Sequence, residues 1–227
     1  MRIERMGTSI PYGPMFALQE ARHHEVRADT SRETLFLLEH TSVVTLGKNA
    51  SEGNLRLSNQ EYASRGIEVV ETGRGGDVTW HGPGQIVGYP IIHFAEHERD
   101  IRKYVWNLEE VMIRTAADYD VVARRVEGLR GIWVGEEKLA AIGVRIARWT
   151  TLHGFAFNVE PDLTNFSLIV PCGIANKGIT SLKKLLGHAS PSLADVERQL
   201  CRHLGDVLGR KLVESNASPL PKVSTDD

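Results

Sequence analysis

The chain has 227 residues, with 27 basic and 29 acidic side chains and a formal net charge of -2. This length is enough to bury a full core and is typical of one α/β domain. The near-neutral charge excludes a general attraction to nucleic acid or to an anionic membrane, so a charged partner must meet a local patch. The longest apolar runs, such as residues 34–38, are far below the roughly 20 residues that span a bilayer. We therefore expect a cytoplasmic protein with no membrane or nucleic-acid partner.

The cysteine and histidine patterns give no support for a metal site. Two cysteines, Cys172 and Cys201, are too few for a disulfide framework or for a tetrahedral cysteine zinc site. The nine histidines show no H-E-x-x-H spacing. Residues 173–178 have the length of a phosphate-binding loop, but Ile179 stands where the essential lysine belongs. We expect neither a metal nor a cofactor.

The periodicity of the first half predicts helices that alternate with short strands. Apolar residues at helical spacing, after first turns whose residues suit the start of a helix, predict the helices. Short β-branched runs predict the strands. The predicted elements are a helix over 11–29, strands over 34–38, 43–46 and 67–70, a strand over 85–94, and a helix from 101 to about 119.

The second half predicts an antiparallel meander followed by a last helix. Strands are expected over 131–135, 139–146 and 152–159, and the first two are joined by a turn at 136–138. Ser192 begins a capping pattern ahead of an amphipathic helix, and residues 215–227 are polar and proline-containing, which is typical of a disordered tail. The expected fold is α/β (α+β), with a mixed, largely antiparallel sheet flanked by helices in one domain over residues 1–214.

The segment from Gly73 to Gln85 reads G-R-G-G-D-V-T-W-H-G-P-G-Q and is the most informative stretch of the chain. Five glycines and a proline in thirteen residues indicate a shaped loop, because glycine adopts unusual backbone angles and lets a ligand approach the main chain. Two consecutive tight turns would explain the glycines equally well. They would not require the interleaved Arg74, Asp77, Thr79, Trp80 and His81, so we interpret the segment as a binding surface.

A cysteine nucleophile is the leading candidate for chemistry. Cys172 lies between a proline and a glycine at the end of an apolar segment, whereas Cys201 has the setting of a structural cysteine in a helix. A thiol with a pKa of about 8.5 needs a group that takes its proton. His81, His153 and Lys138 are candidates for that group, and local sequence does not choose among them.

With these residues in view, the chain resembles the lipoyl(octanoyl) transferases, also called the lipoate-protein ligase B family. The similarity lies in H-T-S-V-V-T-L-G-K from His40, R-G-G-D-V-T-W-H-G-P-G-Q, G-E-E-K-L-A-A-I-G-V-R, H-G-F-A-F-N-V and P-C-G-I, in that order over residues 35–185. Trp80 departs from the tyrosine or phenylalanine that the family usually has, and Thr41-Ser42 replaces a commonly proline-containing pair.

The resemblance implies a Cys172 and Lys138 dyad, in which the cysteine carries the acyl group and the lysine lowers its pKa. It implies the fold of the biotin and lipoate protein ligases. Octanoyl-acyl carrier protein would be the donor, and apo lipoyl domains of 2-oxoacid dehydrogenase complexes and the glycine cleavage H protein would be the acceptors of a monomeric enzyme. The implied substrate-binding residues are Arg74, Gly75, Gly76, Asp77, Val78, Thr79, Trp80, His81, Ala141, Ile142, Gly143, Gly154, Phe155 and Ala156.

Two further expectations accompany this assignment. Val78, Trp80, Ile142 and Phe155 would line the slot for the acyl chain. A basic surface would meet the acidic carrier protein, with Arg145, Arg148, Lys177, Lys183 and Lys184 as its candidates. There are two alternatives. The first is an ATP-dependent lipoate or biotin ligase, and the second is a non-catalytic protein that binds lipoyl groups or the carrier. The P-C-G-I segment argues against the first, and the presence of both Cys172 and Lys138 argues against the second.

Overall fold

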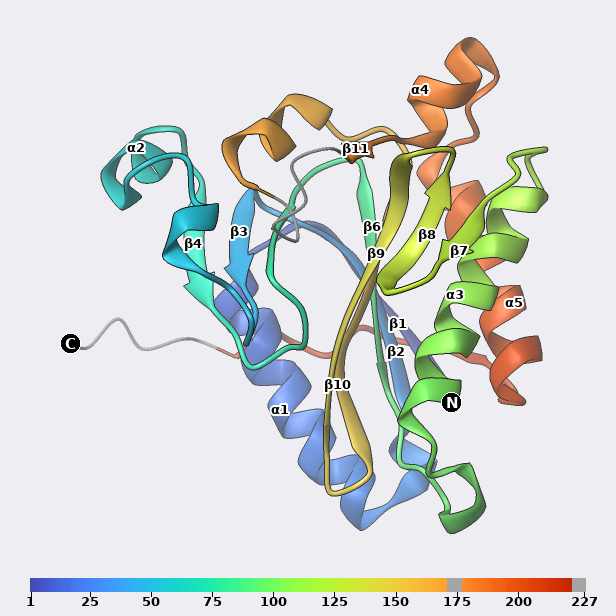
Figure 1. The fold of residues 1–227 in the computed structure, drawn as a ribbon. Helices are drawn as coiled ribbons and strands as arrows, with labels where there is room; N and C mark the ends of the chain where they lie inside the picture. Colours follow the sequence, from blue (N-terminus) through green and yellow to red (C-terminus); the bar gives the residue numbers. More distant parts are fainter. Residues whose placement is uncertain (171–176, 222–227) are drawn as a thin grey trace.

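The computed structural model describes residues 1–170 and 177–221 of the chain (Figure 1). The helices are α1 (Tyr12–Ala28), α2 (Asn59–Ser64), α3 (Ile101–Ala117), α4 (Leu182–Leu186) and α5 (Leu193–Leu208). The strands are β1 (Arg2–Ile10), β2 (Thr34–His40), β3 (Val43–Leu46), β4 (Glu68–Glu71), β5 (Val78–His81), β6 (Gln85–Ile91), β7 (Arg124–Val126), β8 (Leu129–Val134), β9 (Glu137–Ala147), β10 (Thr150–Asn158), β11 (Gly178–Ile179) and β12 (Val213–Ser215).

In this part of the chain, nine strands form a large mixed sheet. Eight of them follow the order β12-β1-β2-β6-β10-β9-β8-β7, and β11 pairs with β9 beside them. The pairs from β2 through β7 are antiparallel, whereas β1 is parallel to both of its neighbours and β11 is parallel to β9. A smaller sheet has the order β4-β3-β5. The expected mixed, largely antiparallel sheet with flanking helices is confirmed.

Helices cover both faces of the large sheet, and the residues of β2 show why. Leu35 and Leu37 pack in the core that α3 and α5 complete, whereas Phe36 and Leu38 pack in the core that α1 completes. Successive side chains of a strand point to opposite faces, so the apolar run over residues 35–38 is suited to a sheet that is buried on both sides. Figure 1 shows α3 and α5 side by side on one side of the sheet and α1 on the other.

The structure corrects the sequence-based boundaries at three places. The Gly-rich segment contains a strand, β5, which pairs with β3 in the smaller sheet. Lys138 lies within β9 rather than in the preceding turn. The segment expected to be disordered from residue 215 is paired at its start, because Ser215 lies opposite Glu4 of β1, and the Ser218 amide donates to the Glu4 carboxylate at 2.9 Å. Residues 222–227 of that segment lie outside the described residues.

The last helix begins as expected. The Ser192 hydroxyl accepts a hydrogen bond from the Asp195 amide at 3.2 Å, which satisfies one of the free N–H groups of the first turn. None of the helices in residues 1–170 and 177–221 is long and apolar enough to cross a membrane.

Candidate active site

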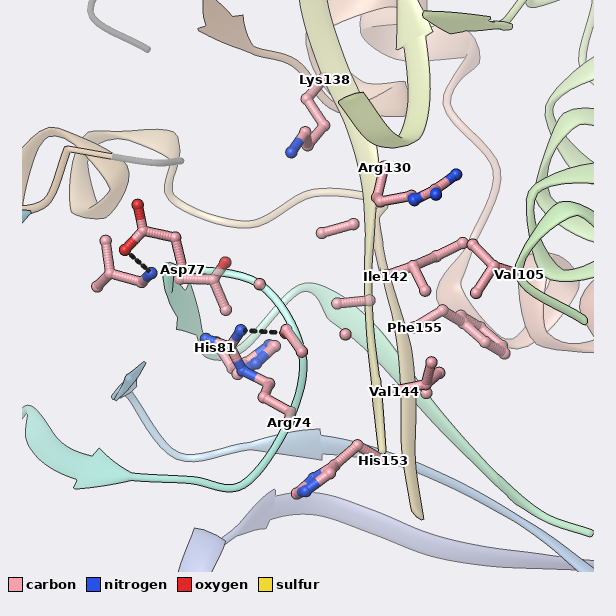
Figure 2. Close-up of a pocket in the computed structure, with 18 of the residues that line it drawn as sticks. Arg74, Asp77, His81, Val105, Arg130, Lys138, Ile142, Val144, His153 and Phe155 are labelled. Atoms are coloured by element: carbon pink, nitrogen blue, oxygen red, sulfur yellow. Dashed lines mark hydrogen bonds between the residues drawn. The ribbon is translucent and has the colours of Figure 1, made fainter. Parts of the chain in front are cut away.

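A cavity of about 550 Å³ lies between the Gly-rich segment and the middle of β9 and β10 (Figure 2). Two walls bound it. One wall is the Gly-rich segment, residues 74–81, and the other is formed by the paired strands. Of the residues expected to bind substrate, all except Trp80 line this cavity: Arg74, Gly75, Gly76, Asp77, Val78, Thr79, His81, Ala141, Ile142, Gly143, Gly154, Phe155 and Ala156.

The strand wall depends on very small residues. Gly143 of β9 lies directly opposite Gly154 of β10, and Ala141 lies opposite Ala156. A Cβ atom at Gly143 would lie only 3.0 Å from Cδ of Arg74, and one at Gly154 would overlap the Gly88 carbonyl oxygen of β6. The absence of these side chains allows the Gly-rich segment and β6 to approach the two strands closely.

The loop wall is held by side-chain hydrogen bonds. The buried guanidinium of Arg74 donates to the Thr45 hydroxyl at 3.1 Å and to the Thr45 carbonyl at 2.6 Å. The Asp77 carboxylate accepts from the Val78 amide at 2.7 Å and from the Asn54 side chain at 2.8 and 2.7 Å. These contacts tie the segment to β3 and to the 3-10 helix at Glu52–Asn54.

Lys138 enters the cavity from β9, and only 9% of it is exposed. Its Nζ lies 4.9 Å from the centre of the Trp133 ring, a cation–π contact from the neighbouring strand. Ile179 of β11 pairs with Lys138, and the Thr180 amide donates to the Lys138 carbonyl at 3.0 Å. The predicted turn at 136–138 is therefore wrong for Lys138, because β9 already includes this residue and places it on the cavity wall.

Cys172 lies outside the described residues. The described residues near it in sequence border the cavity, since Phe166 and Ile179 both line it. Cys201 is buried in the core beside α3, and burial raises the pKa of its thiol to about 11. A thiol with so high a pKa is almost entirely protonated near neutrality, so Cys201 fits the structural role expected for it.

The two histidines considered as bases both line the cavity. Burial lowers the pKa of His81 to about 3 and that of His153 to about 3. Behind them, burial lowers the pKa of His40 to about 4. A nitrogen with so low a pKa is a poor proton acceptor at neutral pH, so these rings can accept hydrogen bonds more readily than they can take a proton from a thiol.

Trp80 was expected to line the slot for the acyl chain, but it does not line the cavity. Its indole is 1% exposed and packs edge-to-face against Phe166, with ring centres 5.3 Å apart, in the core beneath the smaller sheet. Thr79 and His81 line the cavity from the opposite face of β5, because neighbouring residues of a strand face opposite sides. Val78, which packs in the same core as Trp80, reaches the cavity at the start of the strand. The aromatic residue therefore supports the loop wall from behind and does not contact the cavity.

The sequence interpretation missed residues that come from distant parts of the chain. Tyr12 of α1, Val105 of α3 and Arg130 of β8 line the cavity, as do Tyr89 and Asn158. Asn158 belongs to the H-G-F-A-F-N-V motif, so its place in that motif was an available signal. Tyr12 and Val105 carry none, because only the packing of α1 and α3 against the sheet brings them there.

Comparison with known proteins agrees with this geometry. Residues 11–205 match the family described as Lipoyl protein ligase A/B catalytic domain. An octanoyltransferase of Geobacter metallireducens is 44% identical over 222 residues, covering 97% of this chain and all of that protein. One from Caldicellulosiruptor saccharolyticus is 44% identical over 204 residues, covering 89% of this chain and 86% of that protein.

The fold is shared with solved protein ligases. A bi-partite lipoate protein ligase from Thermoplasma acidophilum superposes with a TM-score of 0.73 at 15% identity, covering 96% of this chain and 87% of that one. Lipoate-protein ligase A bound with ATP gives 0.76 at 16% identity, with 96% and 89% covered. The biotin protein ligase of Aquifex aeolicus gives 0.54 at 10% identity, with 92% and 70% covered. The chain therefore belongs to the lipoyl protein ligase A/B catalytic domain family and is an acyltransferase.

Proposed function

We propose that the protein takes the octanoyl group from the phosphopantetheine thioester of acyl carrier protein onto Cys172 and passes it to a lysine of an apo lipoyl domain. The observation that carries the proposal is the position of Lys138. Only 9% of this residue is exposed, and it lies on the wall of a cavity that is also lined by Phe166 and Ile179, which precede and follow the cysteine segment in the sequence. The octanoyltransferase relatives, which are similar over most of the chain, support the same acyl group.

The chemistry needs one proton shuttle and one nucleophile. In the first step, Lys138 accepts the thiol proton of Cys172, the sulfur attacks the thioester carbonyl carbon, and the carrier thiolate leaves with a proton from Lys138. In the second step, the amine of the acceptor lysine attacks the new thioester and Lys138 takes its surplus proton. The cysteine thiol is regenerated with that proton. A thioester is exchanged for a thioester first, and formation of an amide then drives the sequence forward.

The cavity has a suitable wall for an apolar chain. Val78, Ile142 and Phe155 contribute its larger apolar side chains, next to the small residues of the strand wall. Burying an eight-carbon chain contributes roughly 0.8 kcal/mol per methylene, or about 5 kcal/mol in all. This is enough free energy to select strongly for chain length.

The partners in this proposal are an acidic carrier protein and the lipoyl domains of 2-oxoacid dehydrogenase complexes and the glycine cleavage H protein, met by a monomer in the cytoplasm. The archaeal ligase of similar fold is described together with its E2 lipoyl domain, which supports the acceptor class. Two of the lysines expected to face the carrier already pair with glutamates: Lys177 with Glu136, and Lys184 with Glu137. Arg130, which is exposed at the cavity, is an additional candidate.

Intact-mass spectrometry after incubation with octanoyl-acyl carrier protein tests the mechanism. We expect an octanoyl adduct that hydroxylamine removes, formed without ATP, on wild type and on Cys201→Ser. A Cys172→Ser variant should show no thioester. If wild type carries no such adduct, the thioester mechanism is wrong, and a requirement for ATP and free octanoate would indicate a ligase on the same fold.

A further inference from the structure

Three side chains form a hydrogen-bonded chain from the cavity to the backbone next to Lys138. His81 Nδ1 lies 2.7 Å from Gln85 Oε1, and Gln85 Nε2 donates to Asn158 Oδ1 at 2.9 Å. Asn158 Nδ2 then donates to the Thr180 carbonyl at 3.0 Å. The Thr180 amide donates in turn to the Lys138 carbonyl at 3.0 Å, so the chain ties His81 to Lys138. We call the Gln85 and Asn158 side chains the amide relay.

The backbone carbonyl at the far end fixes the direction of every bond in the relay. A carbonyl only accepts, so the Asn158 amide nitrogen must face Thr180 and its oxygen must face Gln85. Gln85 therefore presents its nitrogen to Asn158 and its oxygen to His81. An oxygen acceptor at Nδ1 requires the hydrogen of neutral His81 to be on Nδ1, which leaves Nε2 with a lone pair.

No donor within residues 1–170 and 177–221 reaches the lone pair of His81 Nε2. Among the described residues Nε2 has no hydrogen-bond partner, while the ring lines the cavity and is 8% exposed. Burial lowers the pKa of this histidine to about 3, so the ring is neutral at physiological pH. Figure 2 shows His81 and Lys138 on the same side of β9 and β10, with Arg130 and Ile142 on the other side.

We propose that the amide relay is a positioning device that holds His81 Nε2 as a fixed hydrogen-bond acceptor for the attacking amine of the acceptor lysine. The inference rests on the proposed function. A neutral primary amine directs its lone pair at the thioester carbon and has two N–H bonds. One proton goes to Lys138 as the amide forms, and the other N–H donates to His81 Nε2. An octanoyl thioester has no donor in its acyl part, so Nε2 is used only when the amine arrives.

The test separates the two half-reactions. Acyl-enzyme formation from octanoyl-acyl carrier protein and transfer from the isolated acyl-enzyme to an apo lipoyl domain are timed for wild type, His81→Phe and Gln85→Leu. We expect both variants to slow the transfer step about tenfold or more, the effect of losing one hydrogen bond to a reacting group. Acyl-enzyme formation should change less than about threefold. Gln199→Leu on α5 is the matched control for the glutamine change and should leave both steps at the wild-type rate.

Nitrogen NMR of the histidine rings gives a readout that a purely structural role would not change. Wild type should show His81 protonated on Nδ1 alone, and folded Gln85→Leu should show a mixture of both neutral forms. Equal slowing of both half-reactions, or a wild-type ring protonated on Nε2, overturns the proposal. Absence of any acyl-enzyme in wild type instead overturns the proposed function, and the NMR result still reports separately on the relay.

Discussion

The two walls of the cavity are built on opposite principles. The loop wall, residues 74–81, is held by hydrogen bonds from polar side chains, such as those between Arg74 and Thr45 and between Asp77 and Asn54. The strand wall is held by the register of β9 and β10, and its contribution is the absence of side chains at Gly143 and Gly154. One wall is therefore specified by hydrogen bonds and the other by packing.

This difference predicts how each wall responds to change. A hydrogen-bonded wall responds to loss of single partners. A close-packed wall does not tolerate added atoms. The strand wall carries a charged side chain. In the described part of the chain, Lys138 is the charged residue among the β9 and β10 positions that line the cavity.

The largest expected effect is the loss of Lys138. In Lys138→Ala we expect octanoyl transfer to fall by about 10²–10⁴, the usual contribution of a general acid–base group. Lys138→Arg should not restore it, because a guanidinium does not give up its proton. Transfer rates with carrier protein and lipoyl domain measure the effect, and melting temperatures report on folding. Activity of Lys138→Ala near wild type would leave the strand wall without a chemical role.

Acid should destabilise both walls through buried histidines, because His81 lies on the loop wall, His153 lies on β10 of the strand wall, and His40 lies behind them. The folded pKa values of His40, His81 and His153, about 4, 3 and 3, lie below the value near 6.5 of an unfolded chain. Their contribution to stability is therefore complete above pH 6.5 and is lost as the pH falls toward the folded values. With about 2 kcal/mol lost per ring, we expect the free energy of unfolding to drop by about 5 kcal/mol between pH 7 and pH 5.

Urea unfolding at pH 7, 6 and 5 measures this loss. A His153→Gln variant should have a shallower pH dependence than wild type. Identical curves for the two proteins would show that the buried rings do not set the acid limit.

Adding one carbon to the strand wall should cost about 2 kcal/mol of stability. In Gly154→Ala the new Cβ would overlap the Gly88 carbonyl oxygen, and backbone atoms there have little room to move. Gly13→Ala in α1 is the matched control, because no atom lies within 4 Å of a Cβ at that position. It should be neutral or slightly stabilising, since alanine favours a helix. Equal urea midpoints for the two variants would contradict close packing at this wall.

Much of this arrangement was predictable from the sequence, for physical reasons that differ by residue. Gly143 and Gly154 lie in recognisable motifs, and the alternation along the predicted strands already suggested a sheet. Trp80 was misplaced because a Gly-rich segment was treated as an irregular loop, whereas β5 imposes strand alternation and turns the indole away from the cavity. Tyr12 was missed because its position depends on the packing of α1, which local pattern does not encode.

The smallest predicted effect tests the anchor of the loop wall. Asn54→Ala removes the two hydrogen bonds from Asn54 Nδ2 to the Asp77 carboxylate but leaves the hydrogen bond from the Val78 amide, so we expect a loss of about 1 kcal/mol in stability. The KM for octanoyl-acyl carrier protein should rise a fewfold, because Asp77 lines the cavity. Asn165→Ala is the control. It removes a hydrogen bond from the Asn165 side chain to the Asp162 carbonyl, outside the loop wall, and should leave KM unchanged. An unchanged KM in Asn54→Ala would mean that the loop wall keeps its shape through its turns and β5 pairing, as the strand wall does through its register.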